Sequence, residues 1–355
     1  MREKICVFPF DEEFIPFLNM VKEKVRSNNI TCYTVKGNYY YNKEVTLPNG
    51  EVIKVYDIKC CFDSDFDIFL LTETNIDVDF NTEILPVMKR ANDLHKEIRV
   101  RRFLSKEELD LCKELGIKMS LMQFDEIEID KQMTERIFPI KTPIIFVFGI
   151  FENTDKLYTE LYIHQYFKDK GIQIKSILSR INGMEINDCY SFPEFILNNK
   201  YSDNQKIIMF NHYIRRMELK MNPDVILVGI PGEIMPLDEK HFGHFGITPY
   251  LISNAVKCDY AVLQAFNNLC DKTYINGLKE ICNSKFAIEI DACCISHTVL
   301  DFSSLRDAEI KFYNSSSKPI NAEIEYYFDF KNGFGEELGE NVLRTLAKYG
   351  NFKLL

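Results

Sequence analysis

The sequence predicts an α/β protein, because short apolar runs alternate with helical patterns along most of its 355 residues. The clearest case lies in the middle of the chain. Pro143 precedes a continuous apolar run, Ile144–Phe148, which is typical of a strand buried on both faces. A helical pattern begins near Lys156, and Ile172–Leu178 returns as a second strand after a glycine turn. Strand, helix and strand in this order form a βαβ unit, which requires a parallel sheet.

The N-terminal part of the chain repeats this order. Lys4–Phe8 and Ile30–Val35 have the composition of strands, and between them Asp11 precedes a helical pattern. The run from Leu47 to Gly50, Leu-Pro-Asn-Gly, is a strong turn signal between two strand-like segments. No GxGxxG motif follows the first strand, so a dinucleotide site of the usual kind is not expected. We therefore expect a Rossmann-like α/β layer with a β-hairpin.

The length of the chain predicts two domains. Asp130–Thr142 is charged, contains a proline and is the best candidate linker. We expect a Rossmann-like N-terminal domain at residues 1–135 and a P-loop-like domain, with a doubly wound, mostly parallel sheet, at residues 141–355. In this second domain we expect further strands at Val225–Val228, Asp259–Gln264, Phe286–Ile290, Glu309–Tyr313 and Glu323–Phe330, and a final helix at Glu337–Tyr349.

Composition and charge narrow the class of protein. The formal net charge of −10 argues against nucleic acid and against an anionic membrane surface as partners. The sequence shows neither the apolar region of a signal peptide nor an apolar run long enough for a membrane helix, which predicts a cytoplasmic protein. The eleven cysteines show no CxxC spacing, so we interpret them as small buried hydrophobic residues.

The loop between the central strand and its helix is where a βαβ unit binds anions, because unpaired backbone N–H groups and the helix dipole favour negative charge there. Gly149 opens this loop, but the second glycine of a P-loop is absent and Lys156 comes one place later than the standard spacing. Leu157 stands where a Ser or Thr normally holds Mg²⁺, although Thr154 or Thr159 could replace that hydroxyl. The loop is therefore either a degenerate P-loop or a simple βα turn with a solvated lysine.

A second informative stretch follows the strand expected at Val225–Val228. Gly232 would allow close approach of the backbone to a ligand, and Glu233 would reach a metal or activate a nucleophile. The alternative is a tight turn with Glu233 in solvent. His241 and His244 follow three residues apart, so a weaker alternative is a metal-dependent hydrolase that uses both histidines with Glu233.

On these segments the chain resembles a family known as peptide maturation system proteins, which occur in anaerobic Gram-positive bacteria, in gene clusters for ribosomally made natural-product peptides. The segments that carry the resemblance are FPFDEEFIPF, VFGIFENTDKLYTEL, SFPEFILNN and PDVILVGIPGEIMP. The resemblance implies a degenerate P-loop in which a glycine turn and an Asp-Lys pair replace Gly-Lys-Ser/Thr. It assigns the site to Gly149, Glu152, Asn153, Asp155 and Lys156. Members often have Cys where this chain has Thr154, so thiol chemistry is not carried over to this position.

These observations lead to one main functional hypothesis and one alternative. The main hypothesis is an accessory protein of peptide maturation that binds ATP or GTP with Mg²⁺, with Lys156 on the phosphates and Glu233 facing the metal as catalytic residues. The ligand-binding residues would be Gly149, Glu152, Asn153, Thr154, Asp155 and Gly232. The alternative is a non-catalytic scaffold that binds a precursor peptide or a peptide-modifying enzyme.

Overall fold

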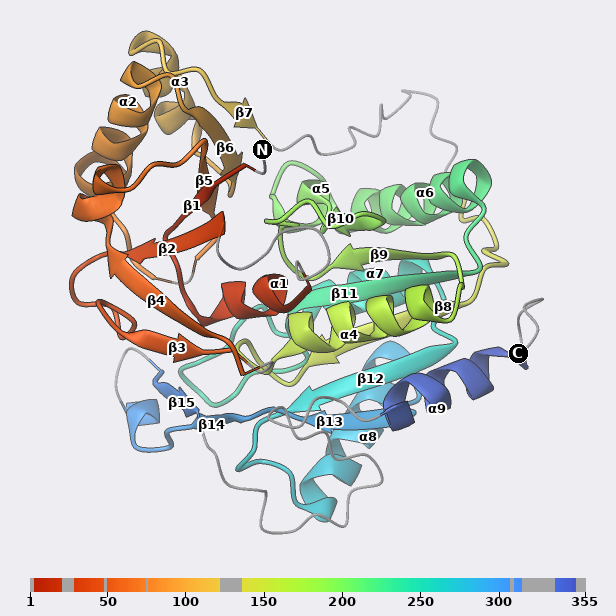
Figure 1. Cartoon of the computed structure of the whole chain (residues 1–355). Coiled ribbons are helices and arrows are strands. Elements are labelled where there is room, and N and C mark those ends of the chain that lie inside the picture. The colour runs from red at the N-terminus through yellow and green to blue at the C-terminus, as the bar shows by residue number, and fades with distance from the viewer. Residues whose placement is uncertain are drawn as a thin grey trace. The chain divides into compact units, whose positions relative to one another are not determined.

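The computed structural model describes residues 3–20, 29–47, 50–74, 76–121, 136–306, 310–314 and 336–348. The chain divides into two compact units, Met1–Gln123 with Ile181–Asn187, and Phe124–Arg180 with Asp188–Leu355. Both are α/β units (Figure 1). The expected boundary placed residues 181–187 in the second domain, but they pack in the first unit, where Ile181 N–H donates to Glu73 at 3.2 Å and Glu185 pairs with Arg101. Residues 130–135 of the expected linker lie outside the described residues.

The first unit contains a seven-stranded sheet in the order β3-β4-β2-β1-β5-β6-β7. Its strands are β1 (Ile5–Phe8), β2 (Ile30–Thr34), β3 (Glu44–Thr46), β4 (Val52–Asp57), β5 (Ile68–Thr72), β6 (Glu97–Arg101) and β7 (Ser120–Leu121). Of these, β3 runs antiparallel to β4 as the outer strand of a hairpin, and the other described pairings are parallel. Counted along the chain without β3, the order is 3-2-1-4-5-6, that of the Rossmann fold. The predicted Rossmann-like layer with a β-hairpin is confirmed.

The helices of the first unit are α1 (Ile15–Met20), α2 (Leu85–Asp93) and α3 (Lys106–Glu114), with short helical turns at Glu12–Phe14, Ile58–Asp63 and Phe80–Ile84. The end of β1 differs from a dinucleotide site. Phe10, two residues beyond the strand, is fully buried, and Asp11 caps the next turn by accepting the Glu13 N–H at 3.0 Å. A bulky ring therefore fills the position where a glycine-rich turn would approach a pyrophosphate.

The second unit contains a six-stranded sheet in the order β10-β9-β11-β8-β12-β13, and all of its described pairings are parallel. Its strands are β8 (Ile144–Gly149), β9 (Ile174–Leu178), β10 (Cys189–Ser191), β11 (Val225–Glu233), β12 (Tyr260–Ala265) and β13 (Ala292–Ile295). A separate antiparallel pair follows, formed by β14 (Thr298–Leu300) and β15 (Phe312–Asn314). The predicted doubly wound parallel sheet is confirmed.

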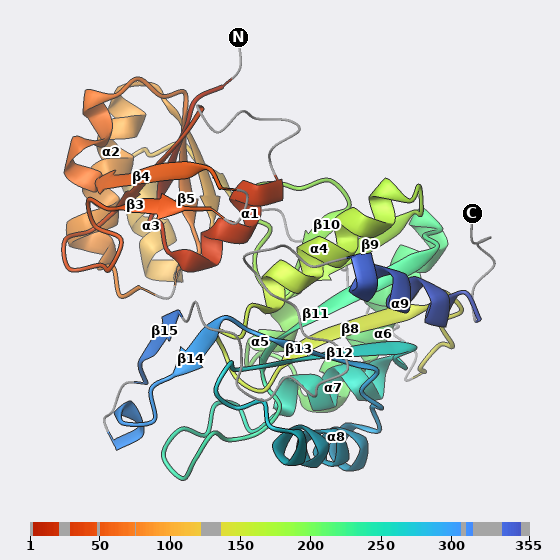
Figure 2. The same cartoon turned by 60° about the horizontal axis from the view of Figure 1, so that its bottom comes forward.

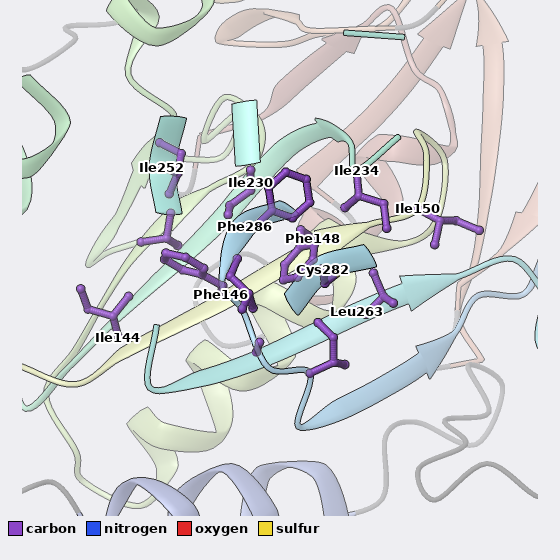
Figure 3. Close-up of a cluster of buried hydrophobic side chains, with 14 of the residues drawn as sticks. Ile144, Phe146, Phe148, Ile150, Ile230, Ile234, Ile252, Leu263, Cys282 and Phe286 are labelled. Atoms are coloured by element: carbon purple, nitrogen blue, oxygen red, sulfur yellow. The ribbon is translucent and has the colours of Figure 1, made fainter. Parts of the chain in front are cut away.

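Helices cover both faces of this sheet. They are α4 (Lys156–Asp169), α5 (Glu194–Leu197), α6 (Asp203–Met221), α7 (Ile247–Ala255), α8 (Lys272–Phe286) and α9 (Glu336–Leu346), with a short 3-10 turn at Ser304–Arg306. Figure 2 shows α4 and α9 on one face and α7 and α8 on the other. Alternate residues of β8 point to opposite faces: Ile145 and Val147 pack towards α4, whereas Phe146 and Phe148 join the larger core on the other face (Figure 3).

The strand predicted at Phe286–Ile290 is wrong. Phe286 is the last residue of α8, where it packs into the same core as Cys282 one turn earlier. The strand is β13, which begins at Ala292 and pairs in register with Val262. In the tail, the strand near residues 309–313 is β15, the predicted final helix corresponds to α9, and the strand predicted at 323–330 lies outside the described residues. No helix in the described part of the chain is long and apolar enough to cross a membrane.

The connections around β8 create a topological switch point. After β8 the chain enters α4 on one face, whereas after both neighbouring strands, β11 and β12, it enters α7 and α8 on the opposite face. The loop at 150–155 therefore lies at the point where the connections from neighbouring strands pass to opposite faces of the sheet. Ligands of open α/β sheets bind at the carboxyl ends of strands at such points.

Candidate functional site

Lys156 is the first residue of α4, and it is only 6% exposed. Its Nζ donates to the carbonyl oxygen of Gly232 at 2.7 Å and to Glu152 Oε2 at 3.3 Å. Glu152 also accepts the Gly232 N–H, through Oε1 at 2.9 Å. The Lys156 side chain is thus directed at the turn of β11, and its charge is neutralised by a carboxylate of its own loop.

The loop closes on itself around Gly149. A Cβ at this position would collide with Thr154 Oγ1 and would lie 3.1 Å from Lys156 Cδ, so the absence of a side chain is required. Thr154 is fully buried, and its hydroxyl donates to the carbonyl of Phe151 at 3.0 Å. The loop is therefore tightly packed against Gly149.

The Asp155 carboxylate lies on the opposite side of the loop from Glu152. Asp155 precedes α4 in a left-handed conformation, φ 59°, and its side chain makes no capping hydrogen bond to the helix. Its Oδ2 instead accepts from Ser296 Oγ, from the His297 N–H at 3.1 Å and from His297 Nδ1 at 2.7 Å. Ser296 and His297 directly follow β13, the edge strand of the sheet. The Asp155 carboxylate therefore connects the loop to the end of β13 and holds the His297 imidazole in one orientation. Asn153, φ 57°, is a second left-handed residue of the loop.

Glu160 is a buried carboxyl group one helical turn after Lys156. It is completely buried, Oε2 accepts the Ser179 N–H at 2.9 Å, and Oε1 has no hydrogen-bond partner. Burial raises the pKa of Glu160 to about 7, against the opposing influence of Ser179 and of the charges on Lys156 and Arg180. The carboxyl occupies the space that a side chain at residue 229 would need, which explains the glycine there.

Glu233 lies at the end of β11, directly opposite Gly149 on β8. It is 3% exposed and accepts the backbone N–H of His244, and a Cβ at Gly243 would collide with its carboxyl. Burial and the neighbouring charge of Glu152 raise the pKa of Glu233. The structure thus brings Glu233 beside the loop but directs its carboxylate into the following turn.

The two histidines of the metal alternative do not converge. His241 Nδ1 pairs with Asp238 Oδ1 at 2.9 Å, whereas the His244 side chain is 83% exposed and its Nδ1 lies 3.7 Å from Glu233 Oε1. Within the described ranges, no group of three or more His, Cys, Asp or Glu side chains is arranged to hold a metal ion. The geometry gives the metal-dependent hydrolase no support.

The hydroxyl groups proposed to replace the missing P-loop Ser/Thr are engaged elsewhere. Leu157, which stands in that place, is buried at 4% exposure. Thr159 Oγ1 accepts a hydrogen bond from the buried Gln264 on β12, and the Thr154 hydroxyl is bound within the loop. Both threonine hydroxyls are therefore hydrogen-bonded within the protein.

Sequence reasoning located the loop and the β11 turn but missed Glu160, Ser296 and His297. A signal for Glu160 was present: it is an acidic residue four places after Lys156, on the face of a helix that is otherwise apolar there. His297 carried no such signal, because the strand before it was predicted at Phe286–Ile290, whereas β13 spans Ala292–Ile295.

The fold and the site together define an α/β protein that combines a Rossmann-ordered sheet with a doubly wound parallel sheet, and that has a buried lysine at the switch point of the second. Its structure is similar to the crystal structure of a DUF1611 family protein from Anabaena variabilis ATCC 29413, with a TM-score of 0.53 and 9% sequence identity, over 86% of this chain and 91% of that one. At this identity the likeness concerns the fold alone. No protein-family model and no curated protein matches the sequence.

Proposed function

We propose that the second unit binds a phosphorylated ligand, ATP or GTP with Mg²⁺ in the first instance, at the N-terminus of α4. The observation that carries this proposal is the buried Lys156 ammonium, placed at the switch point and aimed at the turn of β11. A lysine is costly to bury without a strong anionic partner. A phosphate group supplies more negative charge than the single carboxylate that now neutralises it.

The wider electrostatics of the loop fit the same proposal. The Glu152 side chain is 43% exposed, but its carboxylate is partly desolvated between Lys156 and Gly232, which raises its pKa. The charges of Lys156 and Arg180 outweigh this effect, and the pKa of Glu152 lies below its ordinary value. The two cations thus already stabilise one negative charge at the mouth of the loop. The fourteen-residue helix α4 adds the favourable end of its dipole at the same place.

The test is isothermal titration of the full chain with ATP and with GTP, each with Mg²⁺. Lys156→Ala should lower the affinity at least about tenfold, because a charge-assisted contact to phosphate is lost. Lys170→Ala is the matched control, since it removes the same charge from the exposed C-terminal end of α4. Equal binding by wild type and Lys156→Ala, or no binding by wild type, contradicts the proposal.

The second candidate function is binding without catalysis. It is favoured by a specific observation: Leu157 replaces the magnesium hydroxyl, and Thr154 and Thr159 are both engaged within the protein. In this version the unit is a scaffold whose loop responds to a ligand, and the bound partner is a precursor peptide or a peptide-modifying enzyme. That partner class, and the place in peptide maturation, rest on the resemblance of the four sequence segments.

Affinity purification from the native host tests the scaffold. Wild type and Lys156→Ala should both recover a precursor peptide or a modifying enzyme encoded beside this chain. If neither a precursor peptide nor a modifying enzyme is recovered, the scaffold proposal is contradicted. The nucleotide proposal is then still tested separately by the titration. Steady release of phosphate from ATP or GTP by wild type, lost in Lys156→Ala, would instead show catalysis at the loop.

A further inference from the structure

The Glu152 carboxylate holds both donors that face the turn of β11. Its Oε1 accepts the Gly232 N–H at 2.9 Å, and its Oε2 accepts Lys156 Nζ at 3.3 Å. The lysine also donates to the carbonyl of Gly232 at 2.7 Å. One ammonium group, one carboxylate and residue 232 of β11 therefore form a closed ring.

An ammonium and a backbone N–H that converge on one site are the donors with which proteins bind tetrahedral oxyanions. Here a planar oxyanion of single charge occupies them. A terminal phosphoryl group presents the same acceptor oxygens with greater charge and one more acceptor. Glu152 therefore accepts hydrogen bonds from both donors, and a phosphate group would accept them with a greater negative charge.

The Glu152 and Lys156 side chains differ in how easily each can move out of the ring. The Glu152 side chain is 43% exposed and belongs to the loop, so it can rotate into water. The Lys156 side chain is 6% exposed and lies at the start of a fourteen-residue helix packed against the sheet. Glu233 also disfavours the negative charge of Glu152 at this place, because the two carboxylates repel each other. Burial and the charge of Glu152 both raise the pKa of Glu233. Exchange at this ring would thus replace the glutamate and retain the lysine.

We propose that Glu152 occupies the position of the ligand's terminal phosphoryl group and has to be displaced when the ligand binds. This inference rests on the proposed function and specifies it: the ligand ends in a phosphoryl group that takes over the Gly232 N–H and the Lys156 ammonium. Without the ligand, the glutamate keeps the loop closed and weakens binding by direct competition. The class of ligand is a compound with a terminal phosphate, such as a nucleoside triphosphate or inorganic pyrophosphate.

The test measures the affinity of wild type, Glu152→Ala and Glu152→Gln for ATP and for inorganic pyrophosphate by titration calorimetry. Glu152→Ala should bind both ligands about tenfold more tightly than wild type, because the competing charge-assisted hydrogen bonds are gone. Glu152→Gln should fall between them, since its amide oxygen still accepts the Gly232 N–H without the charge. Glu280→Ala, which removes the same charge from an exposed position of α8, should bind as wild type does.

Hydrogen exchange supplies a readout that does not depend on affinity. The Gly232 amide should be protected in the free wild type, exchange at least about tenfold faster in Glu152→Ala, and regain protection when ATP is added. If wild type binds ATP but Glu152→Ala binds no more tightly, the competition is refuted while the phosphate site stands. If neither protein binds ATP or pyrophosphate, both proposals fall. If the Gly232 amide stays protected in Glu152→Ala, the closed ring is refuted.

Discussion

Replacement of Glu160 by glutamine should remove a pH dependence from the stability of this protein. The carboxyl has a pKa of about 7 in the folded chain, against an ordinary value of 4.5. It therefore holds its proton more tightly when folded, and its contribution to stability is fully present below about pH 4.5 and is lost as the pH rises through 7. At 1.36 kcal/mol per pKa unit the total is about 3 kcal/mol, of which about 2 kcal/mol falls between pH 5 and pH 8.

The assay is urea unfolding of the full chain, followed by circular dichroism at several values between pH 5 and pH 8. Glu160→Gln should gain about 2 kcal/mol relative to wild type across this range, because glutamine does not ionise. Other titrating groups are common to both proteins and cancel in the comparison. Glu280→Gln, on the exposed surface of α8, should show no such trend. A constant difference between Glu160→Gln and wild type at every pH would refute the claim that burial governs this carboxyl.

Three further predictions concern packing and charge in the second unit. Gly229→Ala should lower the free energy of unfolding by about 2 kcal/mol, because its Cβ would overlap the buried Glu160 carboxyl. Gly277→Ala, within α8 and with no atom near the added Cβ, should instead raise it by up to about 1 kcal/mol. Asp188→Asn should cost about 2 kcal/mol at neutral pH, since two lysines overcome the effect of burial and lower the pKa of Asp188 to about 2. This cost should fade as the pH falls from about 4 to 2, where wild type itself loses the ion pairs. Urea unfolding checks all three, and equal stability of the two glycine variants would contradict the first.

The sequence predicted the fold correctly where the local hydrophobic pattern of a segment agrees with its surroundings in the folded protein. Ile144–Gly149 forms a strand because it is apolar throughout and lies between two neighbouring strands with helices on both faces. The prediction failed at Phe286–Ile290, where Phe286 is the last residue of α8 and residues 287–291 connect the helix to β13. Periodicity alone does not separate these two cases, because a short buried helix end and a short buried strand carry the same residues.

The sequence indicated which segments form the candidate site, but not the contacts that their side chains make. Gly149, Lys156 and Glu233 meet because they follow adjacent parallel strands, and strand order was the main assumption needed. The hydrogen-bond partners of these residues could not be predicted from the sequence. Whether a loop glutamate faces solvent or turns back to neutralise a lysine depends on a backbone N–H at Gly232, 80 residues away in the chain. No pattern in the sequence encodes that contact, because backbone donors have no sequence signature.

The position of Lys156, one residue later than in a standard P-loop, has a structural consequence. The longer loop contains two left-handed residues, Asn153 and Asp155, and the side chains of Glu152 and Asp155 leave it in different directions. Glu152 reaches the turn of β11, while Asp155 reaches the residues that follow β13. The Asp155 side chain is 17% exposed and accepts three hydrogen bonds, whereas that of Glu152 is 43% exposed and accepts two. Release of Glu152 alone would therefore open the half of the loop beside Gly149 and leave the start of α4 anchored, so that the lysine keeps its place while the amides become accessible.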